Sequence, residues 1–189
     1  MIMGSVSAIR EDNIRRMIAY SSVAQVGYIY MGLGLGTEAG VVASIYHVLS
    51  HAATKSLLFV AASGLTDASG GSVRFKDLRG AGYRHKLAGI AFTVGSLSMV
   101  GLPMFSGFIS KLLFSQEAVG HTHKMLPTLI ALAVSTVLNA VYFMKTVISI
   151  YMPPGEEVEL AESRNIAMRE QPGKSVALVC FIILNLIMG

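Results

Sequence analysis

Three ionisable side chains lie inside an apolar run of the sequence, residues 46–59, YHVLSHAATKSLLF. His47, His51 and Lys55 are spaced at i, i+4 and i+8, so on a helix of about 3.6 residues per turn they form one stripe. Imidazole titrates near neutral pH and can pass a proton between its two nitrogens, and a lysine shielded from water can exchange its proton. The stripe therefore predicts a proton relay, with stations about 6 Å apart that water bridges.

Each member of this stripe also has a purely structural explanation. A lysine can extend to the membrane interface or pair with a carboxylate, and a single buried histidine is often a hydrogen-bonded core residue. Lys55, however, has at least nine mostly apolar residues on either side within the run 41–64, and that run holds no Asp or Glu. Three such groups on one stripe favour the relay.

A metal or haem site at His47 and His51 is a second interpretation of the same residues. A metal needs a further ligand, which no Glu or Cys is placed to supply, and two histidines on one helix cannot bind opposite faces of a haem. The sequence also has no glycine-rich phosphate loop, cysteine pair or nucleophile elbow. We therefore expect no catalytic residue, no metal and no cofactor, with an intramembrane metalloenzyme as the alternative.

A fourth ionisable residue, Lys111, follows a predicted break in the apolar run 87–118. As one straight helix, these 32 residues would be about 48 Å long, more than a hydrocarbon core of about 30 Å. Gly101, Pro103 and Gly107 predict the interruption, because proline removes an amide donor and clashes with the preceding turn. Broken helices place ion sites near the middle of a membrane, so Lys111 is a candidate relay residue. Its alternative role is to anchor a short helix at the interface.

The composition indicates what kind of protein must position these residues. Of the 189 residues, 53% are hydrophobic and only 14% are charged, whereas a soluble domain has about 25% charged residues. The sequence therefore predicts an all-α, polytopic membrane helix bundle. The expected spans are residues 17–35, 41–64, 87–101, 104–118, 128–151 and 175–189.

The basic residues lie in short segments between these runs, so the net charge of +4 indicates membrane-protein loops rather than a nucleic-acid partner. With six spans, residues 10–16 and 65–86 lie on one side of the membrane and hold eight Lys or Arg residues. Residues 152–174 lie on the other side and hold three. Because cytoplasmic loops carry an excess of Lys and Arg, the first side is predicted to be cytoplasmic.

Three motifs, in order, resemble one known family. They are DNIRRMIAYSSVAQVGY, YHVLSHAATKSLLFVAASG and GLPMFSGFISK. They are similar to the antiporter-like subunits L, M and N of respiratory complex I, the subunits A and D of Mrp-type Na+/H+ antiporters, and membrane-bound hydrogenases. The resemblance implies about fourteen helices built from two inverted five-helix repeats, of which this chain would be the second, with its interrupted helix.

The resemblance also implies roles for individual residues. Lys55 matches the central lysine that links two half-channels, His47 and His51 match its relay partners, and Lys111 matches the terminal lysine or glutamate of the interrupted helix. The family's glutamate–lysine pair lies in the first repeat and is not in this sequence. The final apolar run from Ser175 has only 15 residues, where a span needs roughly 20, so we expect a piece of a larger protein or a truncated product.

We therefore expect a proton-translocating, antiporter-like subunit that is not catalytic by itself and belongs to a multisubunit complex. Its expected partners are other membrane subunits, such as those of an NADH-quinone oxidoreductase or hydrogenase, together with H+ or Na+ and the lipid bilayer. The main alternative is a truncated structural or assembly fragment without transport activity of its own.

Overall fold

The computed structural model describes residues 1–120, 122–153 and 172–189. These residues are almost entirely helical and contain no strand, although one isolated antiparallel bridge joins Asn13 and Arg74. The helices are α1 (Ile2–Arg10), α2 (Ile14–Leu35), α3 (Glu38–Asp67), α4 (Ala81–Arg84), α5 (Lys86–Val100), α6 (Ser106–Val119), α7 (Thr122–Tyr151) and α9 (Pro172–Ile187).

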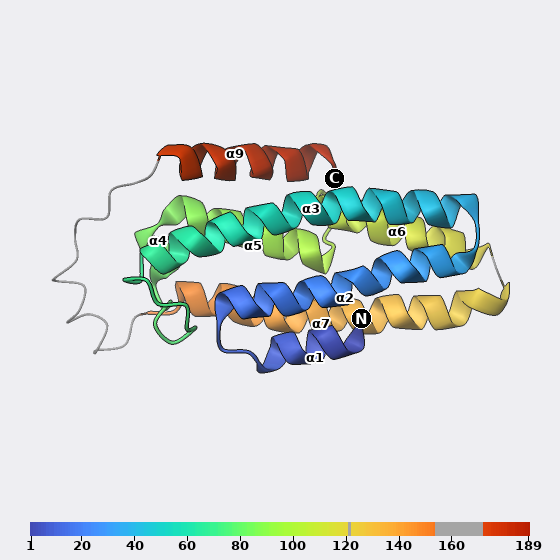
Figure 1. Cartoon of the computed structure of the whole chain (residues 1–189), viewed down its shortest axis with the longest axis horizontal. Helices are drawn as coiled ribbons and strands as arrows, with labels where there is room; N and C mark the ends of the chain where they lie inside the picture. The colour runs from blue at the N-terminus through green and yellow to red at the C-terminus, as the bar shows by residue number, and fades with distance from the viewer. Residues whose placement is uncertain (121, 154–171) are drawn as a thin grey trace.

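The long helices run side by side along one axis of the molecule (Figure 1). Helix α3 lies at the centre and contacts α2, α5, α6 and α9, while α7 packs on α1, α5 and α6. We call the end that holds the α1–α2 connection and residues 68–80 the loop end. We call the opposite end, which holds residues 36–37 and the start of α7, the turn end. Helix α3 traverses the whole bundle between them.

Local sequence features fix where α2 and α3 begin and end. The Asn13 side chain accepts hydrogen bonds from the amides of Arg15 and Arg16, at 3.0 and 3.1 Å, and so caps α2. Gly36 ends α2 with a left-handed φ of 75°, which glycine adopts without strain. The Thr37 hydroxyl then accepts a bond from the amide of Gly40 at 3.0 Å and starts α3. This turn sets α2 and α3 antiparallel.

Helices α5 and α6 lie end to end and together traverse the bundle once (Figure 1). Helix α5 ends at Val100, followed by Gly101 with a φ of 89°, and α6 begins at Ser106. At 15 and 14 residues, each half is about 21 to 23 Å long, shorter than a hydrocarbon core of about 30 Å. The stretches predicted as separate spans, 87–101 and 104–118, are thus the two halves of one interrupted helix.

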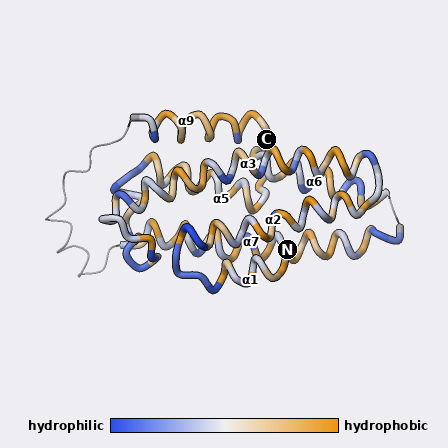
Figure 2. The backbone as a smooth tube through the Cα atoms, in the orientation of Figure 1, coloured by the Kyte–Doolittle hydropathy of each residue, from blue (hydrophilic) through white to orange (hydrophobic). Residues whose placement is uncertain are grey.

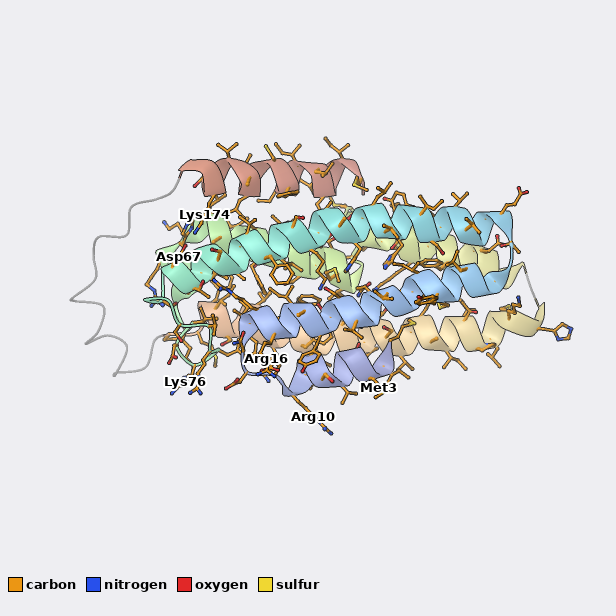
Figure 3. The ribbon with its side chains drawn as sticks, in the orientation of Figure 1. Met3, Arg10, Arg16, Asp67, Lys76 and Lys174 are labelled. Carbon is orange, nitrogen blue, oxygen red and sulfur yellow. The ribbon has the colours of Figure 1, made fainter. Side chains whose placement is uncertain are left out.

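This single traverse corrects the predicted sides of the loops. At the loop end, the Tyr83 and Tyr151 rings pack edge to face, with centroids 5.3 Å apart. Lys174, near the start of α9, forms an ion pair of 2.6 Å with Asp67 at the end of α3 (Figure 3). The prediction that residues 152–174 lie opposite to 65–86 is therefore wrong for the residues that flank 154–171. Residues 154–171 themselves lie outside the described part.

Apolar side chains form two buried clusters, one towards each end of the bundle. The larger cluster includes Leu58, Leu65 and Phe92 near the loop end, and the smaller one includes Tyr28 and Phe114 near the turn end. Most buried polar side chains of α2, α3 and α6, such as Gln25, His47 and Ser110, lie between these clusters along the helices. The centre of the bundle is therefore polar, which is where the candidate site lies.

The outer faces of the helices are largely apolar, and the hydrophilic residues gather at the two ends (Figure 2). Glu38–Asp67 and His123–Tyr151 are long and apolar enough to span a bilayer, and Lys86–Val100 and Gly173–Ile187 are shorter apolar helices. The number of membrane crossings stays a prediction.

Candidate functional site

The predicted stripe on α3 faces the interior of the bundle. His47 and Lys55 are 4% and 7% exposed, and His51 is half-buried. The two imidazole rings stack with their centroids 6.1 Å apart and an interplanar angle of 12°. The spacing of i and i+4 therefore brings these two rings together, at the separation that one helical turn gives.

His47 is held by α6 and α2. Its Nδ1 lies 3.0 Å from the hydroxyl oxygen of Ser110, and its ring lies 5.7 Å from the ring of Phe114 and 5.3 Å from the ring of Tyr28. The Nε2 atom of His47 and the Nδ1 atom of His51 are buried without a hydrogen-bond partner in the described part of the chain. A buried polar atom without a partner costs about 1 to 3 kcal/mol, so each of these nitrogens is a place for a water molecule or a proton donor.

One small cavity joins α2, α3, α5 and α6 at this point. Its lining includes Gln25, His47, His51, Ser98 and Lys111. The cavity has a volume of about 10 Å³, close to the minimum space that holds one water molecule. Three of the four predicted relay residues therefore line one shared space, and Lys55 does not line it.

Lys55 lies one turn further along α3, against α2 and α7. Its Nζ donates to the carbonyl oxygen of Ile18 at 2.9 Å and to the Ser21 hydroxyl, and it lies 5.9 Å from the centroid of the Phe143 ring. Among the described residues, no carboxylate pairs with it. A carbonyl and a hydroxyl can bind either an ammonium group or a neutral amine, so this environment accommodates both protonation states.

Lys111 lies where α5 ends, in the middle of the bundle. Its Nζ donates to the carbonyl oxygen of Met99 at 3.4 Å and to that of Val100, and it lies 5.8 Å from the centroid of the Tyr28 ring. A cation is favoured there, because the last carbonyls of a helix carry partial negative charge. A methyl group on Gly101 would lie 2.9 Å from Lys111 Cδ, so only glycine lets the lysine approach this closely. Lys111 thus caps the broken helix and also faces the cavity.

Sequence reasoning missed a network of buried hydroxyl and amide groups next to the break. Ser106 lies at its centre, with hydrogen bonds of 2.9 Å to both Ser50 Oγ and Asn185 Oδ1. Asn185 Nδ2 in turn donates to the Thr54 hydroxyl at 3.0 Å, and Ser98 lies 3.2 Å from Ser106. The network ties α3, α5, α6 and α9 together. The spacing of Ser50 and Thr54 at i and i+4, beside the histidines, was the available signal.

Among the described residues, no three His, Cys, Asp or Glu side chains lie close enough together to hold a metal ion. The chemistry on offer is that of neutral hydrogen-bonding groups around two imidazoles and two amines. Such a set can take up and release protons.

Comparison with known proteins identifies the family. Residues 1–139 match the family described as NADH:quinone oxidoreductase/Mrp antiporter, TM. The chain belongs to this family. The resemblance predicted from the three sequence motifs is therefore confirmed.

Relatives and solved structures agree with this assignment. NADH-quinone oxidoreductase subunit N of Desulforudis audaxviator is 38% identical over 166 residues, which cover 84% of this chain and 32% of the relative. A chain of the membrane-bound sulfane sulfur reductase, an archaeal respiratory membrane complex, has a TM-score of 0.85 at 27% identity and covers 100% of this chain and 30% of that one. A chain of the Mrp complex from Dietzia has a TM-score of 0.83 at 20% identity, covering 99% and 41%.

These similarities confirm the all-helical, antiporter-like membrane fold, and the chain is a membrane protein of this family. The chain spans about a third of the length of the curated relatives it matches.

Proposed function

We propose that this chain forms the proton-conducting part of an antiporter-like membrane subunit, with His47, His51, Lys55 and Lys111 as relay residues. The single observation that carries the proposal is the cavity at the centre of the bundle, where side chains of both histidines and Lys111 line one space. The free space that these side chains share is about the size of one water molecule, and a water there is the proposed bridge for a proton between them. Exchange of Na+ for H+, which the resemblance to Mrp-type antiporters implies, is a variant of this proposal.

Lys55 is the next station in this proposal, one helical turn beyond His51. Its partners are neutral groups among the described residues, so no fixed carboxylate holds its charge in place. A buried lysine paired with a carboxylate contributes to structure, whereas one that has only dipoles around it can change its charge during a transport cycle.

Other membrane subunits are the proposed partners, because similar chains occur in an Mrp complex and in an archaeal respiratory membrane complex. In this proposal, the energy for transport comes from these subunits through changes of charge. We place the protein as a multi-pass protein of the inner or plasma membrane, with the loop end facing the cytoplasm, since the loop end carries most of the basic residues.

The test is Lys55→Ala in the complete complex, reconstituted in vesicles with a pH-sensitive dye. Removal of the central lysine is expected to abolish proton translocation while the complex still assembles, because the relay loses one of its stations. The matched control is Lys145→Ala, which removes an exposed lysine whose Nζ donates to the carbonyl oxygen of Ile9 at 3.3 Å. Translocation at the normal rate in Lys55→Ala would refute the relay and favour a structural or assembly role.

A further inference from the structure

A second group of buried polar side chains lies outside the cavity, between α2 and α7. It comprises Ser5 of α1, Ser21 and Tyr28 of α2, and Ser135, Asn139 and Tyr142 of α7, each at most 1% exposed. We call it the α2–α7 polar cluster. Ser135, Asn139 and Tyr142 are spaced at i, i+4 and i+7, so one face of an otherwise apolar helix presents them together.

The groups of this cluster follow one another from Tyr142 to Tyr28. The Tyr142 hydroxyl donates to Asn139 Oδ1 at 2.5 Å and lies beside the hydroxyls of Ser5 and Ser21. Asn139 also lies beside the hydroxyl of Tyr28, as Ser135 does. The cluster is therefore a file of polar groups along the α2–α7 contact, rather than isolated side chains.

Both ends of this file reach residues of the proposed relay. At one end, Ser21 accepts a hydrogen bond from Lys55 Nζ. At the other end, the Tyr28 ring lies 5.8 Å from Lys111 Nζ and 5.3 Å from the His47 ring. The file thus begins at Lys55 and ends at the tyrosine whose ring packs beside His47 and Lys111, and it follows a different helix from the histidine stripe.

Among the described residues, four atoms of the cluster are buried without a neighbour in good hydrogen-bonding geometry: Ser5 Oγ, Tyr28 Oη, Ser135 Oγ and Asn139 Nδ2. Each such atom costs about 1 to 3 kcal/mol, and apolar side chains of similar size would avoid that cost. Stability alone therefore does not account for the cluster. Bound water does, because one internal water typically satisfies about three polar groups.

We propose that the α2–α7 polar cluster is a second proton path, in which hydroxyl groups and bound water join Lys55 to the Lys111 end of the cavity beside the histidine stripe. This inference rests on the proposed function, since the path has a use only if protons move through the chain. Each hydroxyl or water oxygen on the path gains one proton on one side and releases another on the opposite side. Asn139 keeps its protonation: its Oδ1 accepts from Tyr142 at rest, and its Nδ2 holds a water molecule on the way to Tyr28. The Tyr142 hydroxyl turns from Asn139 Oδ1 to that water to release its proton, and then takes a new proton from the Ser21 side.

The test measures four variants of the complete complex in vesicles. They are Tyr142→Phe, His51→Leu, the double variant that combines these two changes, and Lys55→Ala. Tyr142→Phe removes only the hydroxyl and keeps the ring that packs on Phe143, at a centroid distance of 4.7 Å. With two parallel paths, each single variant should lower the translocation rate about two- to five-fold, and the double variant should lower it about 100-fold, because each path covers for the other. The control is Tyr83→Phe, an exposed tyrosine at the loop end, which should leave the rate unchanged.

The outcomes separate this inference from the proposed function. If Lys55→Ala abolishes translocation but Tyr142→Phe has no effect, alone or with His51→Leu, the second path is wrong and the relay stands. If Lys55→Ala translocates normally, the relay itself is wrong, and the second path is wrong with it.

If Tyr142→Phe prevents assembly, the second path is tested instead by a density map of the wild-type complex that resolves water molecules. Water within hydrogen-bonding distance of Asn139 Nδ2 and Tyr28 Oη supports the path, and a dry cluster overturns it.

Discussion

Ser21 and Ser22 are adjacent on α2 and carry the same hydroxyl group, but their partners differ. Both hydroxyls donate to the Ile18 carbonyl of their own helix, at 2.8 and 3.3 Å, but only Ser21, which is fully buried, also accepts a hydrogen bond from Lys55 Nζ among the described residues. The Ser21 hydroxyl can accept from an ammonium group and donate to a neutral amine. Ser21 is therefore suited to stay bonded to Lys55 while the charge of the lysine changes.

This difference predicts unequal effects of two matched substitutions. Ser21→Ala removes a hydrogen bond to a buried, ionisable group, which is worth about 1.5 to 3 kcal/mol, so it should slow proton translocation about ten-fold or more. Ser22→Ala removes a hydroxyl of the same size one residue away and should leave the rate within about two-fold of wild type. Proton uptake by vesicles that contain the complete complex measures both. Equal rates for the two variants would contradict the role given to Ser21.

Basic side chains cap the ends of several helices, and the interrupted helix uses the same device. Lys145, Lys124 and Arg84 donate to carbonyl groups at the ends of α1, α2 and α3, as Lys111 does for α5. The first three act at the ends of the bundle. Lys111 acts at its centre, because α5 ends halfway through, and so a capping lysine becomes a neighbour of His47 and the cavity.

The Lys111 side chain lies close to Gly101, so substitutions at these two positions should have coupled effects on stability. Gly101→Ala forces a side chain into a left-handed conformation, which costs roughly 1 to 2 kcal/mol, and also presses on Lys111, so the destabilisation should reach about 2 kcal/mol or more. In a Lys111→Ala background, the destabilisation by Gly101→Ala should fall to the cost of the left-handed backbone conformation alone. Thermal unfolding of the purified protein in detergent measures both values.

Gly34→Ala is the matched control, since nothing lies within 4 Å of a Cβ added there and its φ is not left-handed. It should leave stability unchanged or raise it by up to about 1 kcal/mol, because alanine favours a helix. An equal penalty for Gly101→Ala with and without Lys111 would show that the two residues do not press on each other.

The sequence predicted features that depend on neighbouring residues, and it did not predict contacts between helices that are far apart in the chain. The helices follow the apolar runs, and the break between Val100 and Ser106 follows from Gly101 and Pro103, because these depend on neighbouring residues. The Thr54–Asn185 hydrogen bond joins positions 131 residues apart, and nothing in either segment predicts it. The prediction of which loops share a side of the membrane was wrong for a related reason. A glycine–proline break in the sequence does not indicate whether the two half-helices cross the bundle once, end to end, or twice.

At the scale of the whole molecule, the basic residues are divided very unequally between the two ends. Within the described part, ten Lys and Arg residues lie at the loop end: Arg10, Arg15, Arg16, Arg74, Lys76, Arg79, Arg84, Lys86, Lys145 and Lys174. At the turn end lies Lys124. With α5 and α6 counted as one traverse, the imbalance is larger than the sequence alone indicated, and it favours a cytoplasmic loop end.

Labelling of single cysteines tests this orientation. In a Cys180→Ser background, Lys76→Cys introduces a thiol at the loop end and His123→Cys introduces one at the turn end, both at exposed positions. A membrane-impermeant maleimide added to intact cells should label His123→Cys, and it should label Lys76→Cys only in inverted membrane vesicles. The reverse pattern would place the loop end outside the cytoplasm.

The carbonyl oxygen of Ile18 accepts hydrogen bonds from three side chains, Lys55 Nζ at 2.9 Å and the hydroxyls of Ser21 and Ser22 at 2.8 and 3.3 Å. A hydrogen bond from a charged donor is stronger than one from a neutral donor, so the stretching frequency of this one peptide group depends on the charge of Lys55. Isotope-edited infrared spectroscopy of a carbonyl-labelled Ile18 would read that charge directly. The carbonyl stretch of Ile18 on α2 thus reports the protonation state of Lys55 on α3.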